Sequence, residues 1–208
     1  MKSDNPMREP ITEKQLMALV KMFNAQDQGP VNEEIGVFIM SRAYLVKHKK
    51  GDIIHKAGNV CRVMNFLTTG LVRGFIMDSN KELTTWIVVE HELAAPIISY
   101  VNQSATIENV QALEDCEMIT MDYDDIQELY LKFPDFNRIT RRLFEIYYSK
   151  AELRALIARF STAEKKYQFF LENFQELSNR VTQIYIASFL GIDQATLSRI
   201  RRQKKKLV

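Results

Sequence analysis

Hydrophobic and polar positions follow two different patterns along the chain, and the change falls near residue 123. Between residues 43 and 121, short runs rich in branched and aromatic residues are separated by turn sequences such as Lys50-Gly51-Asp52 and Asp78-Ser79-Asn80-Lys81. Such spacing is typical of antiparallel strands. It predicts a double-stranded β-helix, or jelly roll, with strands over 43–48, 52–55, 64–68, 70–77, 83–89, 107–112 and 117–121.

Helical periodicity governs both ends of the chain. Apolar residues at steps of three and four predict short helices over 12–26 and 32–40 before the strands, and another over 124–132 after them. A long helix is predicted over 135–160. Ser161 and Glu164 then form a capping box that starts a helix over 163–177. The fold class is therefore α+β.

The long helix carries a heptad-like apolar seam that is interrupted only by Lys150. The seam is longer than one compact domain needs to cover, so we expect it to join two copies of the chain through parallel or nearly parallel helices. The alternative is a helix packed wholly within its own subunit. The residues assigned to this dimer seam are Phe136, Ile139, Leu143, Ile146, Leu153 and Ile157.

The stretch 181–202, VTQIYIASFLGIDQATLSRIRR, predicts a helix-turn-helix. Gly191 ends the first helix, where a left-handed residue costs little, and Asp193 can cap the second. The residues expected to face inward are Ile184, Ala187 and Leu190 in the first helix and Leu197 and Ile200 in the second. A plain helical hairpin has the same apolar pattern, but it has no need for the basic run 201–206 that follows.

Length and charge support a division of the chain into domains. The 208 residues, 46% of them hydrophobic, suffice for one large or two small domains, and the pattern divides them into a β-roll at 1–133, a dimerisation helix at 134–160 and a helix-turn-helix domain at 161–208. The net charge of +2 hides 15 basic against 7 acidic residues from 133 onward. This asymmetry favours nucleic-acid binding by the C-terminal part.

Several classes of protein are disfavoured by what the sequence lacks. No run of about 18 apolar residues occurs, and the first ten residues have no signal-peptide core, so we expect a cytoplasmic protein without a membrane partner. Two cysteines, Cys61 and Cys116, are too few for a four-thiolate cluster. We expect neither a metal nor a cofactor, and no catalytic residues.

The order of a β-roll, a long helix and a helix-turn-helix resembles bacterial transcription regulators of the Crp-Fnr family. The motifs that carry the resemblance are the Lys50-Gly51-Asp52 turn, Gly58, Gly70, Ala112-Leu113-Glu114-Asp115-Cys116-Glu117 and the stretch 185–199. The resemblance implies a cyclic-nucleotide-binding-like roll and a homodimer that acts on double-stranded DNA with a palindromic operator. RNA polymerase is an implied partner.

The resemblance also assigns base reading to Gln194, Ala195 and Arg199. Glutamine can pair with adenine and arginine with guanine, whereas Ala195 offers only a methyl contact where the family commonly has an acidic residue. The expected operator is therefore not the usual one of the family. The DNA backbone contacts are assigned to Thr196, Ser198, Arg201, Arg202, Lys204, Lys205 and Lys206, the three lysines standing in for a strand hairpin that often follows.

The roll lacks the sequence features of a cyclic AMP site. His91 and Gln103 occupy positions where the family's binders have glycine and arginine, and residues 82–131 contain eleven acidic residues and no lysine or arginine. We therefore expect a regulator that is not controlled by cyclic AMP, unless Arg62 or Arg73 folds into the site. An unknown small-molecule effector near Trp86 and Tyr100 is the remaining possibility for the roll.

Two other functions stay open at this point. One is a dimeric ligand-sensing or protein-interaction module that does not bind DNA. The other is a cupin-type metal enzyme, since jelly rolls host such sites, although the three histidines lack the close spacing that such sites use.

Overall fold

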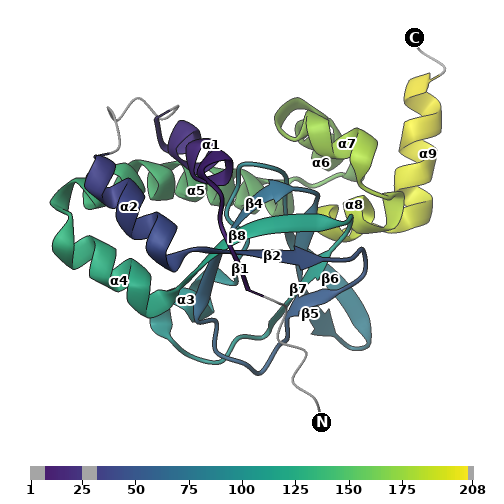
Figure 1. Ribbon diagram of the computed structural model, residues 1–208. Helices are drawn as coiled ribbons and strands as arrows, with labels where there is room; N and C mark the ends of the chain where they lie inside the picture. Colours follow the sequence, from purple (N-terminus) through teal and green to yellow (C-terminus); the bar gives the residue numbers. More distant parts are fainter. Residues whose placement is uncertain (1–7, 25–31, 206–208) are drawn as a thin grey trace.

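The computed structural model describes residues 8–24 and 32–205 (Figure 1). Its centre is a β-roll of two antiparallel four-stranded sheets. The first has the order β1 (Glu9–Pro10), β2 (Tyr44–His48), β8 (Cys116–Asp122) and β4 (Val63–Thr69). The second has the order β3 (Ile53–His55), β7 (Glu108–Ala112), β5 (Val72–Asp78) and β6 (Lys81–Val88). Leu67 and Met118 of the first sheet and Val72 and Val110 of the second share one buried core.

The roll predicted from the sequence is confirmed. All seven predicted strands are present with ends that differ by at most two residues, and the short strand β1 is added at the edge of the first sheet. The strands could be found because each is short, apolar toward the core and bounded by turn residues.

Helices cover one end of the roll. They are α1 (Glu13–Asn24), α2 (Glu33–Arg42), α3 (Ile97–Asn102) and α4 (Tyr123–Lys132). The amide of Thr12 donates to Gln15 Oε1 at 2.7 Å, and the amide of Gln15 donates to Thr12 Oγ1 at 3.3 Å, so α1 starts in a reciprocal cap. The last two residues of the predicted first helix, 25 and 26, lie outside the described residues.

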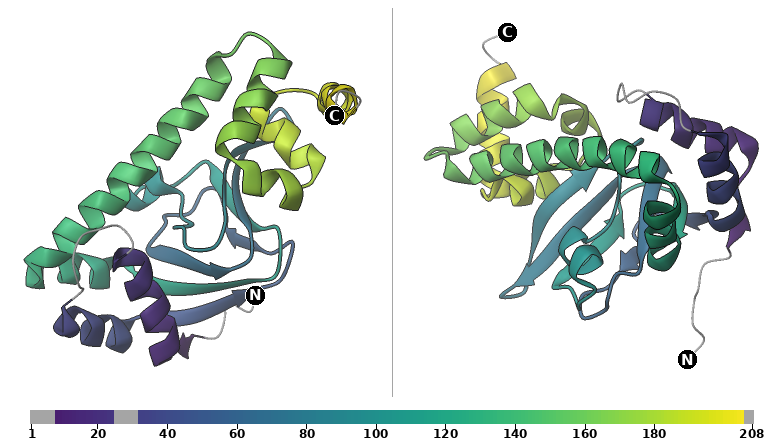
Figure 2. Two further views of the ribbon diagram at one scale, coloured as in Figure 1. Left: turned by 90° about the horizontal axis from the view of Figure 1, so that it is seen from above. Right: turned by 90° about the vertical axis from the view of Figure 1, so that its left-hand side faces the viewer.

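Helix α5 (Pro134–Arg159) lies along the roll and leads to a C-terminal unit at the other end (Figure 2). That unit consists of α6 (Ala163–Asn173), α7 (Gln175–Arg180), α8 (Gln183–Leu190) and α9 (Gln194–Lys205). The single helix predicted over 163–177 is wrong. Its path breaks at Phe174, whose ring lies 5.8 Å from that of Phe170 and 5.6 Å from that of Phe189.

The C-terminal unit and the roll share a hydrophobic core. Leu71, Ile87, Val89 and Leu113 of the roll pack in one cluster with residues of α6 to α9, among them Phe170, which is fully buried. The C-terminal unit is therefore docked on the roll rather than held only by its connection to α5.

Candidate functional sites

Helices α8 and α9 are joined by the three-residue turn 191–193. Gly191 has a φ of 61°, and its amide donates to carbonyl oxygens at the end of α8. Only a residue that tolerates this left-handed conformation ends a helix so sharply. The buried residues of the pair are Ile186, Ala187 and Leu190 in α8 and Leu197 and Ile200 in α9, each at most 3% exposed.

One predicted core position in this pair is wrong. Ile184 is 55% exposed, and Ile186 is fully buried in its place. The spacing 184, 187, 190 and the spacing 186, 187, 190 both fit a helix, so the sequence does not decide between them. The packing of α8 against Phe170 and the roll selects the second.

Helix α9 turns a polar and basic face to solvent. Gln194, Ala195 and Arg199 are exposed. Ala195 and Arg199 lie one turn apart on the side of α9 opposite to Leu197, whereas Gln194 is the first residue of the helix and lies one turn before Leu197. Arg202 is exposed as well, and Thr196, Ser198 and Arg201 are half-buried. Lys204 and Lys205 belong to α9, whereas Lys206 lies outside the described residues.

The surroundings of α9 leave this face open. Arg199 is paired only loosely, with Glu164 of α6 at 3.9 Å and both side chains more than half exposed. Figure 1 shows α9 projecting away from the two sheets. The three predicted base-reading residues are thus all exposed, with Ala195 and Arg199 on one face of α9 and Gln194 in its first turn.

The predicted dimer seam of α5 faces its own subunit, which corrects the sequence analysis. Phe136, Ile139 and Leu143 pack in the core beneath α1, α2 and α4, and Ile157 packs in the core of the C-terminal unit. Ile146 and Leu153 are half-buried on the same side. The heptad-like spacing is present, but it arises from the packing of α5 on the roll and on the C-terminal unit of the same subunit.

A second stripe at the same spacing lies on the other side of α5, and its members Phe144, Tyr148 and Ala151 also line the cavity described below. It runs through Arg141, Phe144, Tyr148, Ala151 and Ala155 at steps of three and four. Phe144 and Tyr148 are 38% and 69% exposed. We call these five residues the outer stripe of α5.

A cavity of about 370 Å³ lies between the second sheet and α5. Trp86 lines it, as predicted, together with Met64, Val88, Leu93, Ala95, Ile97, Phe144, Tyr147, Tyr148, Ala151 and Arg154. Tyr100 does not line this cavity, so the predicted pairing of Trp86 with Tyr100 in one pocket is wrong. Tyr100 is on α3 and faces the core beneath α4, where its ring lies 5.2 Å from that of Tyr123.

The position of Trp86 depends on the glycine opposite to it. Gly74 of β5 pairs with Trp86 of β6, and a Cβ atom on Gly74 would lie 2.2 Å from Trp86 Cε2. The indole therefore lies against the sheet over a residue that has no side chain. Its Nε1 donates to Glu108 Oε1 at 3.1 Å, which fixes the ring at the wall of the cavity.

The cation that lines this cavity is Arg154, and neither Arg62 nor Arg73 reaches it. Arg62 is exposed, and Arg73 is buried by Glu82, Gln111 and the ring of Tyr185. Arg154 lines the cavity instead, from α5, a position far outside the span 82–131. Burial lowers the pKa of its guanidinium, opposed by the nearby Tyr147 and Glu108.

Gln103, which occupies the position where the family's binders have a phosphate-binding arginine, is hydrogen-bonded to the backbone of two other residues. It has a φ of 47°, and its Nε2 donates to the carbonyl oxygens of Tyr100 and Cys61 at 2.7 and 3.1 Å. It therefore points into the protein and supplies no cation to a phosphate.

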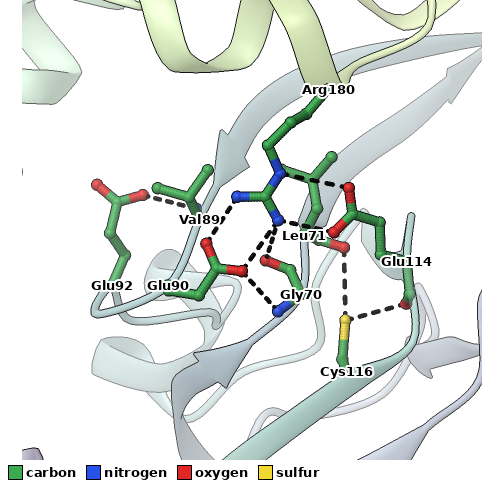
Figure 3. Close-up of polar contacts among 8 residues, drawn as sticks. All are labelled: Gly70, Leu71, Val89, Glu90, Glu92, Glu114, Cys116 and Arg180. Carbon is green, nitrogen blue, oxygen red and sulfur yellow. Dashed lines mark hydrogen bonds and ion pairs between the residues drawn. The ribbon is translucent and has the colours of Figure 1, made fainter.

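Arg180 joins the C-terminal unit to the roll (Figure 3). Its guanidinium donates to Glu90 at 2.7 and 2.9 Å, to Glu114 at 2.7 and 3.3 Å and to the Gly70 carbonyl oxygen at 3.2 Å. We call Arg180, Glu90, Glu114 and Gly70 the Arg180 clasp. Arg180 holds the pKa of Glu90 down at about 2, whereas the ordinary value is 4.5.

A second polar contact joins the two parts at the edge of the second sheet. Ser188 of α8 accepts a hydrogen bond from the Thr84 amide at 2.9 Å and donates to the Glu82 carbonyl oxygen at 2.8 Å. β6 is an edge strand, so Ser188 satisfies backbone groups that no further strand covers.

Comparison with known proteins identifies the roll. Residues 45–133 match the family model described as a cyclic nucleotide-binding domain. No curated protein matches the sequence. The chain thus carries a domain with the cyclic nucleotide-binding fold.

Solved structures of bacterial regulators share the fold of most of the chain. FixK2 from Bradyrhizobium japonicum is 14% identical, with 79% of this chain and 85% of that one covered and a TM-score of 0.65. The c-di-GMP responsive global regulator CLP from Xanthomonas campestris is 13% identical, with 84% and 92% covered and a TM-score of 0.65. The catabolite activator protein of Thermus thermophilus is 18% identical, with 87% and 86% covered and a TM-score of 0.53. Most of the chain thus shares its fold with these three proteins.

The described residues contain neither a candidate metal site nor a membrane-spanning helix. Within residues 8–24 and 32–205, no three histidine, cysteine or acidic side chains gather in a way that could hold a metal ion. No helix in the same ranges is both long and apolar enough to cross a membrane.

Proposed function

We propose that the protein is a sequence-specific DNA-binding regulator of transcription, not an enzyme, and that α9 reads the major groove of a palindromic operator. The observation that carries this proposal is the arrangement of α9. Leu197 and Ile200 are buried, while Gln194 at the start of the helix and Arg199 near its middle are exposed to solvent. Side chains of these two types form bidentate hydrogen bonds with adenine and guanine.

The electrostatics of the chain support the same function. The excess of basic residues is confined to the part of the sequence after residue 133, which contains α9 and the basic run 201–206. Contacts of Thr196, Ser198, Arg201, Arg202 and the terminal lysines 204–206 with phosphates would hold α9 in register. The shared fold with FixK2 and CLP agrees with this role.

The acting species is a homodimer that pairs through the outer stripe of α5. Phe144 and Tyr148 supply exposed apolar surface, and Ala151 and Ala155 allow two helices to approach closely. A two-fold axis along α5 would present two copies of α9 to successive major grooves, about 34 Å apart. This dimer on DNA is the form that would meet RNA polymerase in the cytoplasm.

The proposal excludes cyclic AMP as the controlling ligand. Gln103 faces inward, Arg73 is paired with Glu82, and the segment that would hold a cyclic phosphate is acidic. A phosphate at that place would meet carboxylates and no cation of the roll.

Selection of bound fragments from a random DNA pool tests the function directly. Enrichment of a palindrome with half-sites about 10 bp apart is the expected result. A chain that enriches no sequence and retains no DNA at low salt would instead be a dimeric module that binds a ligand or another protein.

The role of Arg199 can then be tested on the selected operator. Arg199→Ala should weaken binding by about 1–3 kcal/mol and relax the choice of one base, because a bidentate contact is lost. Arg62→Ala removes the same charge from an exposed position on the roll and is the matched control. Fluorescence anisotropy with operator and scrambled duplexes measures both variants. Equal weakening on both duplexes would assign Arg199 to the phosphates instead.

A further inference from the structure

Arg154 differs from the other arginines that contact the roll. Arg8, Arg42, Arg73 and Arg180 each pair with at least one carboxylate. Arg154 is half-buried at the cavity, and it has no ion pair or hydrogen bond with any residue that the structure describes. A half-buried guanidinium without a counter-ion is unfavourable unless something else neutralises it.

The polar groups around the cavity are already engaged elsewhere. Glu108 Oε1 accepts from Trp86 Nε1 at 3.1 Å and from Thr85 Oγ1 at 2.6 Å. Glu92 pairs with Lys150 and accepts from the Val89 amide. Glu108 thus favours the charged form of Arg154 from a distance, but neither carboxylate is placed to bind its guanidinium.

The rest of the lining is apolar or aromatic. Tyr147 donates its hydroxyl to the Leu93 carbonyl oxygen at 3.1 Å, so this hydroxyl faces the backbone of the roll. The remaining surface comes from side chains such as Val88, Leu93, Ile97 and Phe144. The cavity therefore combines an apolar volume of about 370 Å³ with one unpaired cation at its α5 side.

We propose that this cavity binds a small organic acid whose carboxylate pairs with Arg154 and whose apolar body lies against Trp86, Leu93 and Phe144. A carboxylate matches the planar guanidinium in a bidentate geometry. A cyclic nucleotide suits the cavity less well, because its ribose and base need several hydrogen bonds that these side chains do not offer. Each buried polar group left without a partner costs about 1–3 kcal/mol.

The acid would serve as the effector of the proposed regulator, and to that extent the inference rests on the proposed function. The binding step itself does not. The ligand would touch Leu93, and Glu90 of the Arg180 clasp lies three residues before it in the chain. A ligand in the cavity would therefore act on the backbone close to Glu90, which holds the C-terminal unit on the roll.

Trp86 allows a direct test, because it is the single tryptophan of the chain and lines the cavity. The intrinsic fluorescence of the full chain is titrated with decanoate, with decanol and with cyclic AMP. Decanoate should change the Trp86 emission and bind about tenfold or more tightly than decanol, which has the same chain length without the charge. Equal affinities for decanoate and decanol, or stronger binding of cyclic AMP, would overturn the proposal.

Two variants assign the effect to Arg154. Arg154→Gln should weaken decanoate binding by about tenfold or more and leave decanol unchanged. Arg159→Gln, which removes an exposed arginine from the same helix, should change neither. Thermal melts verify that both variants fold, and Arg154→Met provides a second neutral replacement. Full decanoate affinity in folded Arg154→Gln or Arg154→Met would refute the site. A wild-type protein that binds decanoate but no DNA would refute only the proposed function.

Discussion

Arg180 shows at the level of single residues how charge joins the two ends of this chain. Its guanidinium has acceptors on two carboxylates and one carbonyl oxygen, all from the roll. Glu90 in turn accepts from the Gly70 amide at 2.9 Å, so its carboxylate receives hydrogen bonds from both sides. Ionised Glu90 is the form that this arrangement stabilises.

The stability of the clasp should therefore depend on pH. The folded pKa of Glu90 is about 2 and its ordinary value is 4.5, so its contribution is fully present above about pH 5 and is lost as the pH falls toward 2. We expect Glu90→Gln to lower the free energy of unfolding by about 1–2 kcal/mol at pH 7, a figure that allows for solvent screening. Urea unfolding from pH 7 to pH 3 measures the difference, which should shrink below pH 4.5.

Glu152→Gln is the control for this experiment. Glu152 is exposed on α5 and has no ion pair among the contacts of the described chain. Its variant should follow the wild type at every pH. A Glu90→Gln difference that stays constant down to pH 3 would mean that the clasp stabilises the fold by packing and not by charge.

Single residues also show where sequence reasoning ends. Ala195 and Arg199 could be placed on one exposed face because Leu197 and Ile200 fix the buried side of a short helix. Arg154 could not be assigned to the cavity, because it is 68 positions from Trp86 and only the packing of α5 on the roll brings them together. The sequence pattern predicts which face of a helix is buried, but it does not predict which other element packs against that face.

Helix α5 illustrates the same limit for a whole element. It carries two stripes at heptad-like spacing, and the sequence pattern predicted dimerisation through the one with the larger aliphatic residues. The structure buries that stripe within the subunit, because the roll and the C-terminal unit together cover most of the length of the helix. The outer stripe, with Phe144, Tyr148 and two alanines, is the side that a second copy could reach.

Tyr148→Asp should therefore separate the proposed dimer and leave the subunit folded. A charge at the centre of a paired apolar stripe is desolvated without a partner, whereas in the monomer it is exposed. Sedimentation velocity should show a shift from dimer to monomer. Ser149→Asp places the same charge about 100° around the helix and should leave the dimer intact. A dimer that survives Tyr148→Asp would place the interface elsewhere.

The buried stripe should respond in a different way. Leu143 is 7% exposed in the core beneath the N-terminal helices. Leu143→Ala should lower the free energy of unfolding by about 2–5 kcal/mol, since it leaves a cavity, without changing the state of association of the folded protein. Chemical denaturation combined with sedimentation measures both properties. If Leu143→Ala dissociated the dimer without lowering the free energy of unfolding, Leu143 would belong to the dimer interface after all.

At the scale of the whole molecule, the roll and the C-terminal unit are held together by three kinds of contact. A shared apolar core surrounds Leu71 and Phe170, Arg180 forms the clasp, and Ser188 covers the edge of β6. The direction of α9 is therefore set by the roll as well as by α5. In the proposed regulator, loosening of the docked unit would change the direction of α9 and with it DNA binding.

Thr84 offers a reporter of this docking, since its amide donates to Ser188 of the C-terminal unit. We expect Arg180→Gln to raise the exchange rate of the Thr84 amide about tenfold or more, because removing charge-assisted hydrogen bonds lowers the free energy of local opening by at least about 1.5 kcal/mol. The Leu67 amide, which donates to the Glu92 carbonyl oxygen inside the roll, should keep its rate. Hydrogen exchange followed by NMR measures both amides, with Arg202→Gln on the exposed face of α9 as the matched control. If Thr84 remains as protected in Arg180→Gln as in the wild type, the shared core alone holds the unit and the clasp does not control the position of α9.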